Sequence, residues 1–313
     1  MLFFVLIFFF FYLLMFPQRA LASTRDGLLL WYSSVLPVLF PFMLLCALLL
    51  KFDFLERIPK ALSRPFQAVF GVSAQGAFAI IVGFFCGFPM GAKITADLQR
   101  EGKLNEGEAR LLFGFVNNLS PAFILSFVAA QQMECPKLGP VFLFNILGAA
   151  MLYGFFTSIC YRRKKSVFSA PGVYMFLRQQ SAATVYDVID GCIYDTVQST
   201  VKLGVYITIF KIISDAIFYF VPLTHPLLLF LGASIEVTGG IHLLAASHLA
   251  FPLKFIMVNA LCSFGGLSAL AQTVSIAALD GNMLFYYIKS RVMITLLSVA
   301  LSVISILFLC FIL

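Results

Sequence analysis

Long apolar stretches separated by short polar segments run along almost the whole chain, and they predict membrane-spanning helices. A helical span needs about 17–25 apolar residues. Uninterrupted stretches of this length are Gly27 to Leu50, Pro140 to Tyr161, Leu203 to Val221 and Met283 to Leu313. The pattern therefore predicts an all-α polytopic membrane protein.

Gly and Pro residues interrupt further apolar stretches, in matching parts of the two halves of the chain. The interruptions are CGFPMGAK (Cys86 to Lys93) and NNLSPAF (Asn117 to Phe123) in the first half, and IEVTGG (Ile235 to Gly240) and SFGGLSALAQ (Ser263 to Gln272) in the second. In lipid, non-helical backbone survives only where it is buried in protein or lines a polar cavity. Paired interruptions of this kind predict a transporter site near the bilayer midplane, between two repeats.

The interrupted stretches are expected to form two re-entrant hairpins, at residues 70–93 and 226–247, and two broken helices, at 111–130 and 251–277. The basic residues favour hairpins over full crossings. With the N-terminus inside, the hairpin topology places most Lys and Arg residues in the cytoplasm, Lys289 and Arg291 among them, whereas full crossings divide the charges more evenly. The positive-inside rule prefers the first arrangement. Its two halves then have opposite orientations, which makes the fold an inverted repeat.

The expected organisation along the chain is therefore an N-terminal helix and loop, two repeats and a linker. Their bounds are 1–26 for the helix and loop, 27–165 for the first repeat, 166–182 for a polar cytoplasmic linker and 183–313 for the second repeat. Ala20-Leu21-Ala22 resembles a signal-peptidase site, but the positive charges that normally begin a signal peptide are missing. An uncleaved first helix is favoured. Val185 to Thr200 is expected to be a separate amphipathic surface helix, and Lys93 to Glu108 two short solvated helices.

Composition supports the membrane assignment and argues against other classes. Hydrophobic residues make up 61% of the 313 and charged residues 11%, whereas soluble proteins have roughly 45–50% and about 25%. The net charge of +7 comes from basic residues in short loops between apolar stretches, where they indicate the orientation of the protein in the membrane. No nucleic-acid binding is therefore expected. The seven cysteines form no CxxC pair and have no histidine at metal spacing. Neither a metal site nor a cofactor is predicted.

The strings LPVLFPFMLL, CGFPMGAK, NNLSPAF, SIEVTGG and SFGGLSALAQ together resemble the sporulation integral membrane protein YlbJ family, within the wider group of membrane proteins with nucleoside-recognition (Gate) domains. The resemblance runs from about Leu28 to the C-terminus. It implies a fold related to concentrative nucleoside transporters. It also implies a role in moving dipicolinic acid across the outer forespore membrane, from mother cell to forespore.

The candidate substrate-binding residues lie at or beside the interruptions. A half-helix that begins inside the membrane presents unpaired N–H groups and partial positive charge, which would attract an anion, and Lys93 could add a full charge. Glycines at these places could instead allow close helix packing, and the amides and hydroxyls could simply pair freed backbone groups. The candidates are Gly87, Pro89, Gly91, Lys93, Asn117, Asn118, Ser120, Glu236, Thr238, Gly239, Gly240, Ser263, Gly265, Gly266, Ser268 and Gln272.

Glu236 is the candidate residue with the strongest sequence signal for a functional role. A carboxylate at the centre of a membrane helix costs about 2.5–3.5 kcal/mol on insertion scales, so it normally marks a cavity, a partner or a proton site. Glu236 could carry a coupling proton or hold a cation, or it could bond to backbone groups of its own hairpin. Lys211 and Asp215 are four residues apart, on one helix face, and are expected to pair.

Three function classes remain. A transporter for a small anionic metabolite, most simply dipicolinic acid, agrees best with the inverted repeat; a nucleoside or other small metabolite coupled to H⁺ or Na⁺ is the alternative within transport. A non-transporting scaffold in spore maturation is the second class. The third, an intramembrane enzyme, lacks a histidine–carboxylate cluster or a GxSxG elbow. The expected partners are the small anion, membrane lipid and a coupling ion.

Overall fold

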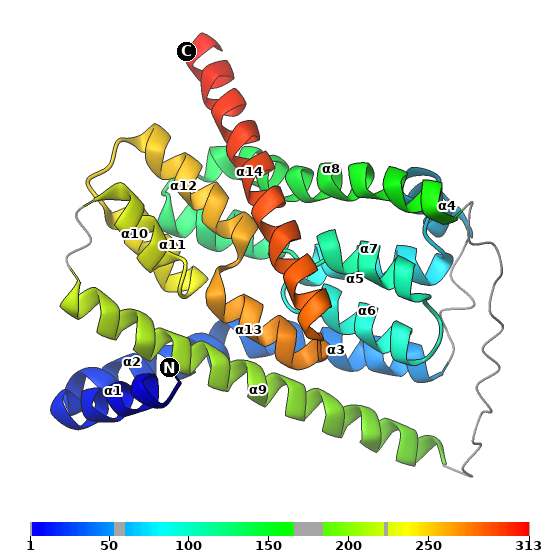
Figure 1. Cartoon of the computed structure of the whole chain (residues 1–313), viewed down its shortest axis with the longest axis horizontal. Coiled ribbons are helices and arrows are strands. Elements are labelled where there is room, and N and C mark those ends of the chain that lie inside the picture. Colours follow the sequence, from blue (N-terminus) through cyan, green and yellow to red (C-terminus); the bar gives the residue numbers. More distant parts are fainter. Residues whose placement is uncertain (1, 53–59, 166–183, 222–224, 313) are drawn as a thin grey trace.

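The structure is a computed structural model that describes residues 2–52, 60–165, 184–221 and 225–312, and these residues form helices and no strand (Figure 1). The α-helices are α1 (Leu2–Met15), α2 (Pro17–Leu30), α3 (Leu36–Lys51), α4 (Lys60–Phe70), α5 (Ala74–Cys86), α6 (Met90–Arg100), α7 (Glu106–Phe115), α8 (Gly139–Lys165), α9 (Val185–Phe220), α10 (Pro226–Ala233), α11 (Val237–Ala246), α12 (Phe251–Phe264), α13 (Gly266–Ala277) and α14 (Gly281–Ile312). Between them lie two π-helical segments, η1 (Trp31–Val35) and η3 (Phe123–Gln132), and a 3₁₀ turn, η4 (Pro136–Leu138).

Several helices are long and apolar enough to cross a membrane. Four candidate spans occur in the described ranges: Pro136–Arg162, Val185–Phe220, Phe251–Ala277 and Gly281–Phe308. Two bent helix pairs could raise that number to six, namely Ile7–Met15 with Pro17–Ser33 and Ser63–Phe70 with Ala74–Cys86, which bend by 105° and 98°. The prediction of an all-α polytopic membrane fold with interrupted helices is therefore confirmed.

A helical hairpin followed by an interrupted helix and a long helix occurs in each half. In the first half, α5 and α6 pack against each other and join at Gly87, whose positive φ of 86° suits glycine. The interrupted helix is α7 followed by η3, and the long helix is α8. In the second half the same order is α10 and α11, then α12 and α13, then α14. Figure 1 shows the two hairpins on opposite sides of the centre of the molecule.

The N-terminal region differs from the expected helix and loop. The first helix does end near Phe16, but α2 begins at Pro17, a residue preorganised for a first helical turn, and runs through η1 into α3. The segment expected to begin at Gly27 therefore begins earlier. Both α2 and α3 pack against α9, and the side chain of Trp31 donates a hydrogen bond from Nε1 to the carbonyl of Thr200, at 3.0 Å.

Helix α9 corrects the prediction of two separate elements at Val185–Thr200 and Leu203–Val221. It is one continuous helix, because nothing between the two stretches ends a helix, and it begins with a capping box in which Thr184 and Asp187 pair side chain to backbone in both directions. The aspartates of its first turns are exposed, as expected for a solvated stretch. The predicted linker, 166–182, lies outside the described residues.

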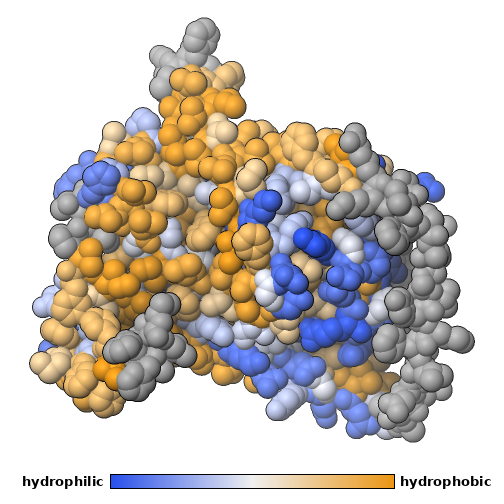
Figure 2. All heavy atoms as spheres, in the orientation of Figure 1, coloured by the Kyte–Doolittle hydropathy of each residue, from blue (hydrophilic) through white to orange (hydrophobic). Residues whose placement is uncertain are grey.

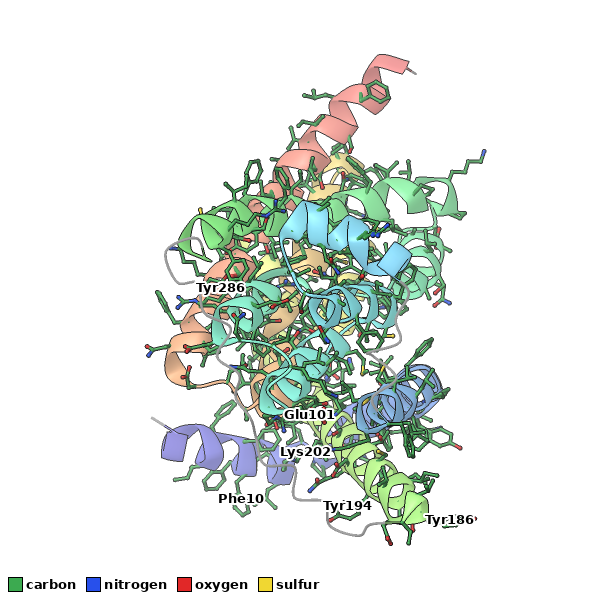
Figure 3. All side chains as sticks on the ribbon, turned by 90° about the vertical axis from the view of Figure 1, so that its right-hand side faces the viewer. Phe10, Glu101, Tyr186, Tyr194, Lys202 and Tyr286 are labelled. Carbon is green, nitrogen blue, oxygen red and sulfur yellow. The ribbon has the colours of Figure 1, made fainter. Side chains whose placement is uncertain are left out.

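Charged residues gather at one end of the molecule. Figure 2 shows a hydrophilic area over α6, α7 and the start of α14 on a face that is otherwise largely apolar, and Figure 3, which looks at this end, labels Glu101 and Lys202 there. Glu101 forms ion pairs with Lys51 and Lys103, at 3.3 and 3.1 Å. The sequence predicted two short solvated helices here. Glu108 is instead buried, and its carboxylate accepts a hydrogen bond from the backbone N–H of Ser73 at 2.5 Å.

Candidate functional site

The tip of the first hairpin packs against the break in the first interrupted helix. Gly83 on α5 and Gly91 on α6 face each other across the backbone of Val116, and a Cβ at either position would collide with the Val116 carbonyl oxygen. At the turn itself, a Cβ on Gly87 would lie 2.8 Å from the backbone nitrogen of Ser120. These glycines therefore let the hairpin approach the broken backbone, which is the packing role expected of small residues in membrane helices.

The second half builds the equivalent contact with hydrogen bonds. Leu267 and Ser268, at the start of α13, donate their backbone N–H groups to the carbonyls of Ser234 and Ile235 in the turn between α10 and α11, at 2.8 and 3.1 Å. Gly265, with φ of 88°, ends α12 and lets the chain turn into α13. The tip of the second hairpin is thus fixed to the break in the second interrupted helix.

The two halves meet at these four breaks. The side-chain amide of Asn117, in the first break, donates to Thr273 Oγ1 on α13 and to the hydroxyl of Tyr287 on α14, both at 2.9 Å. The ring of Phe88, in the first hairpin turn, packs directly against Gly265. A Cβ added to Gly265 would lie only 2.7 Å from Phe88 Cζ. All four predicted interruptions therefore converge, although the first and the last are more than half of the chain length apart in the sequence.

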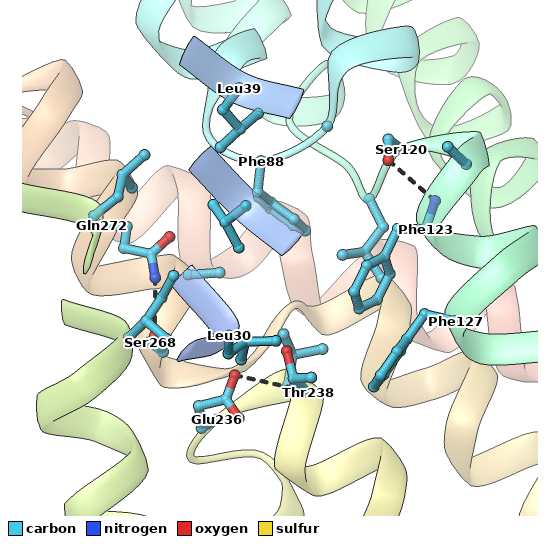
Figure 4. A pocket seen from close by; sticks show the side chains of 18 of the residues that line it. Leu30, Leu39, Phe88, Ser120, Phe123, Phe127, Glu236, Thr238, Ser268 and Gln272 are labelled. Carbon is cyan, nitrogen blue, oxygen red and sulfur yellow. Dashed lines mark hydrogen bonds between the residues drawn. The ribbon is translucent and has the colours of Figure 1, made fainter. Parts of the chain in front are cut away.

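A cavity of about 280 Å³ lies where the breaks meet (Figure 4). The rings of Phe88, Phe123 and Phe127 line it, and Phe123 and Phe127 are stacked with centroids 4.8 Å apart. Six of the predicted site residues line it as well: Gly87, Ser120, Glu236, Thr238, Ser268 and Gln272. The cavity is small, partly aromatic and carries a few polar groups, which is typical of a small-molecule site.

The other predicted residues lie around the cavity without lining it. Lys93 pairs with Asp97 on its own helix, at 3.2 Å, and so does not aim its charge at the cavity. Asn118 donates from its side chain to the carbonyl of Phe115 at 2.7 Å, which closes the end of α7. The remaining residues shape or support the breaks: Pro89, Gly91, Asn117, Gly239, Gly240, Ser263, Gly265 and Gly266.

Glu236 combines both of the roles considered for it. Its side chain is 3% exposed and caps α11, accepting hydrogen bonds from the backbone N–H groups of Thr238 at 3.0 Å and Gly239 at 2.7 Å. It nevertheless lines the cavity. The ammonium of Lys211, which pairs with Asp215 at 2.8 Å as predicted, lies on the same side of Gly239: a Cβ on this glycine would be 3.7 Å from Lys211 Nζ and 3.2 Å from Glu236 Oε2.

The half-helix N-termini are less available to an anion than the sequence suggested. The protein itself pairs N–H groups in the first turn of each one. Glu236 accepts from α11, the Ser120 hydroxyl from Phe123 N at 3.2 Å, and Asn117 Oδ1 from Ala92 N at 3.4 Å. At α13 the acceptors are the two carbonyls of the second hairpin turn. Backbone groups within a membrane need such internal partners, and a further positive charge would stabilise an anionic substrate in the cavity.

Arg291 provides a positive charge that the sequence analysis missed. It was assigned to the cytoplasmic surface with Lys289, but it lies within α14 and is 1% exposed. Its Nη1 donates to the carbonyls of Asn117 at 2.7 Å and Ser263 at 3.5 Å, which belong to the two interrupted helices. The signal was present in the sequence, because a charge inside a long apolar stretch normally marks a functional position.

Removing the Asn117 side chain tests whether the two halves depend on this polar contact. In an Asn117→Ala variant, buried Thr273 and Tyr287 lose the amide that donates to them, and Ala92 N loses its acceptor. Unsatisfied buried groups cost about 1–3 kcal/mol, so we expect a loss of about 2 kcal/mol in unfolding free energy, measured in detergent micelles. Asn282→Ala, at an exposed position, is the control. Equal stability of the two variants would contradict the expectation.

Comparisons with known proteins agree with the sequence motifs. Residues 32–132, which include the first hairpin and the first interrupted helix, match the Gate family, described as nucleoside recognition. The sporulation integral membrane protein YlbJ of Bacillus subtilis (strain 168) is 27% identical over 291 residues, an alignment that covers 83% of this chain and 71% of that protein. No solved structure matches the chain. The chain is therefore similar to the nucleoside-recognition (Gate) family over residues 32–132 and to the sporulation integral membrane protein YlbJ along most of its length.

Proposed function

We propose that this protein is a non-enzymatic transporter for a small anionic metabolite, and that in a spore-forming cell this metabolite is dipicolinic acid. It would lie in the bacterial cytoplasmic membrane with its N-terminus in the cytoplasm. During sporulation it would lie in the outer forespore membrane and move its substrate from mother cell to forespore. The observation that supports transport is the cavity at the meeting point of four breaks from two halves of the chain, an arrangement typical of secondary transporters.

The cavity suits a small, planar ring with polar substituents. Its volume of about 280 Å³ is at the lower end of the range for ligand pockets, roughly 300–1,000 Å³. Aromatic rings on one side can stack on a substrate ring, at offset or edge-to-face distances of roughly 4.5–7 Å. Gln272, whose amide nitrogen donates to Ser268 Oγ at 3.0 Å, keeps its carbonyl oxygen available as an acceptor.

The charge of the cavity supports coupling to a cation. Glu236 is the charged residue among those that line it, and a dianionic substrate beside an ionised carboxylate would be repelled. Like charges about 4 Å apart cost about 4 kcal/mol at an effective dielectric constant of 20. A proton or Na⁺ that enters with the substrate would remove this repulsion at Glu236.

A nucleoside is the second candidate substrate. The lining residues include a carboxylate, two side-chain amides and several hydroxyls but no cation, and such groups can bind a neutral sugar and base. The description of the Gate family as nucleoside recognition points in the same direction. Nucleosides and dipicolinic acid both present a planar aromatic ring to the phenylalanines.

Uptake by the purified protein in liposomes tests the proposal. Liposomes loaded with Tb³⁺ report dipicolinate entry by luminescence, because the dicarboxylate binds the ion. We expect uptake at least about 10-fold above that of protein-free liposomes, and faster uptake with a proton or Na⁺ gradient. Entry of radiolabelled uridine without entry of dipicolinate would support the nucleoside instead. A protein that moves neither compound would overturn transport and favour the scaffold.

A further inference from the structure

Arg291 is buried within α14, and within the described residues only one nitrogen of its guanidinium makes hydrogen bonds. Nη1 makes the contacts with Asn117 O and Ser263 O, and a further one with Asn118 Oδ1 at 3.3 Å. These acceptors stand at the ends of α7 and α12, where helix carbonyls carry partial negative charge. One nitrogen therefore joins the ends of both interrupted helices.

The other edge of the guanidinium has no acceptor. Nε and Nη2 are buried and make no hydrogen bond within the described residues. Their N–H bonds point in the same direction, and together they form the planar fork that binds a carboxylate through two parallel hydrogen bonds. An unsatisfied buried donor is costly, and more so when it belongs to a charged group. The free fork is therefore a ligand-binding feature that the helix ends do not explain.

The ring of Phe88 lies close to both this guanidinium and the cavity. Arg291 Cζ is 5.9 Å from the centroid of the Phe88 ring and 5.4 Å from that of Tyr287, so aromatic faces flank the cation. Phe88 also lines the cavity and packs against Gly265. It sits in the non-helical turn between α5 and α6. Phe88 is therefore the cavity-lining side chain whose displacement would bring the cavity nearer to the guanidinium.

We propose that the Nε and Nη2 edge of Arg291 is a carboxylate-binding site, which a substrate in the cavity reaches when the Phe88 ring moves aside. This inference rests on the proposed transport function and defines its substrate class, a ring that carries a carboxylate. The site supplies the positive charge that the capped half-helices and Lys93 do not supply. It also gives the two interrupted helices and the substrate a common partner.

Arginine is required here by geometry as well as by charge. A lysine at position 291 would keep a cation for the carbonyls of Asn117 and Ser263, but it is a point charge without a fork. Arg291→Lys should therefore keep the fold and lose the carboxylate site. Arg110, an exposed arginine whose guanidinium lies 4.7 Å from the Tyr286 ring centroid, offers the matched control Arg110→Lys.

The test compares binding of dipicolinate with that of its neutral diamide, dipicolinamide, to the full-length protein in detergent micelles. We expect the wild-type protein and Arg110→Lys to prefer dipicolinate, and Arg291→Lys to bind it at least about 10-fold more weakly while binding the diamide as before. Such a loss corresponds to about 1.4 kcal/mol. If Arg291 had a purely structural role, Arg291→Lys would weaken the binding of both compounds equally or of neither. Either result would overturn the carboxylate site.

Uptake in liposomes separates this inference from the proposed function. If the wild-type protein moves dipicolinate and Arg291→Lys keeps its preference for it, transport stands and the site is overturned. If the preference depends on Arg291 but no uptake occurs, the site stands and transport is overturned. Should Arg291→Lys fail to fold, Phe88→Ala exposes the fork to the cavity and should increase the preference for dipicolinate over the diamide; an unchanged preference would overturn the site.

Discussion

Replacing Gly91 by alanine is expected to destabilise the folded protein by about 3 kcal/mol, the upper end of the usual range for overpacking. The added Cβ would collide with the carbonyl oxygen of Val116, and it would also lie 3.1 Å from the Cα of Gly83. Backbone lies on both sides, so no flexible side chain can move away. Alanine is favoured over glycine within a helix by about 1 kcal/mol. A net loss of unfolding free energy would therefore come from the collision with the Val116 backbone. Chemical unfolding in detergent micelles measures it.

Gly191 provides the control for this experiment. It lies in the exposed part of α9, where a Cβ would meet nothing within 4 Å. Gly191→Ala should therefore leave stability unchanged or raise it by up to about 1 kcal/mol. If Gly91→Ala behaved in the same way, the first hairpin would not depend on close approach to the Val116 backbone.

The interruptions were predictable because Gly and Pro act locally. A glycine with positive φ, such as Gly87 or Gly265, ends a helix wherever it lies in the fold, so the sequence alone located the hairpins and broken helices. Continuity was harder to predict. Helix α9 passes through the boundary expected near Leu203 because no residue there forbids it, and a change in polarity along one face does not end a helix.

The partners of the site residues depended on tertiary contacts that no local pattern encodes. Asn117 and Thr273 are far apart in sequence but share a hydrogen bond, whereas the cap that Glu236 forms on α11 is local and was one of the roles considered from the sequence. Arg291 shows the same limit. Its neighbour Lys289 is exposed while Arg291 is buried, so assigning both residues to the surface missed the buried charge of Arg291. Helical periodicity places residues two apart on different faces.

The structure also changes which groups could supply positive charge to an anionic substrate. Helix ends were expected to attract the anion directly, but the protein caps each half-helix N-terminus with its own acceptors. Those caps hold the breaks in shape and leave selectivity to side chains. Glu236 lines the cavity and Arg291 lies next to the Phe88 ring, so in the proposed mechanism a cation and a carboxylate could each bind near a group of opposite charge.

Glu236→Gln is expected to reduce gradient-driven uptake in liposomes by at least about 10-fold while most of the protein still folds. The glutamine has one acceptor oxygen where the carboxylate offers two, so one of the N–H groups of Thr238 and Gly239 loses its partner. The loss of a helix cap costs about 1 kcal/mol, too little to unfold a typical domain of 5–15 kcal/mol. The missing charge, by contrast, removes the place where a proton or Na⁺ would bind.

Two comparisons make this prediction specific. Glu106→Gln changes an exposed glutamate in the first turn of α7 and should leave uptake unchanged. Exchange of labelled for unlabelled dipicolinate without any gradient should fall less than gradient-driven uptake in Glu236→Gln, because exchange does not require net movement of the coupling ion. If driven uptake at matched protein amounts equals that of the wild type, Glu236 is only a helix cap, and the coupling cation must bind elsewhere in the cavity.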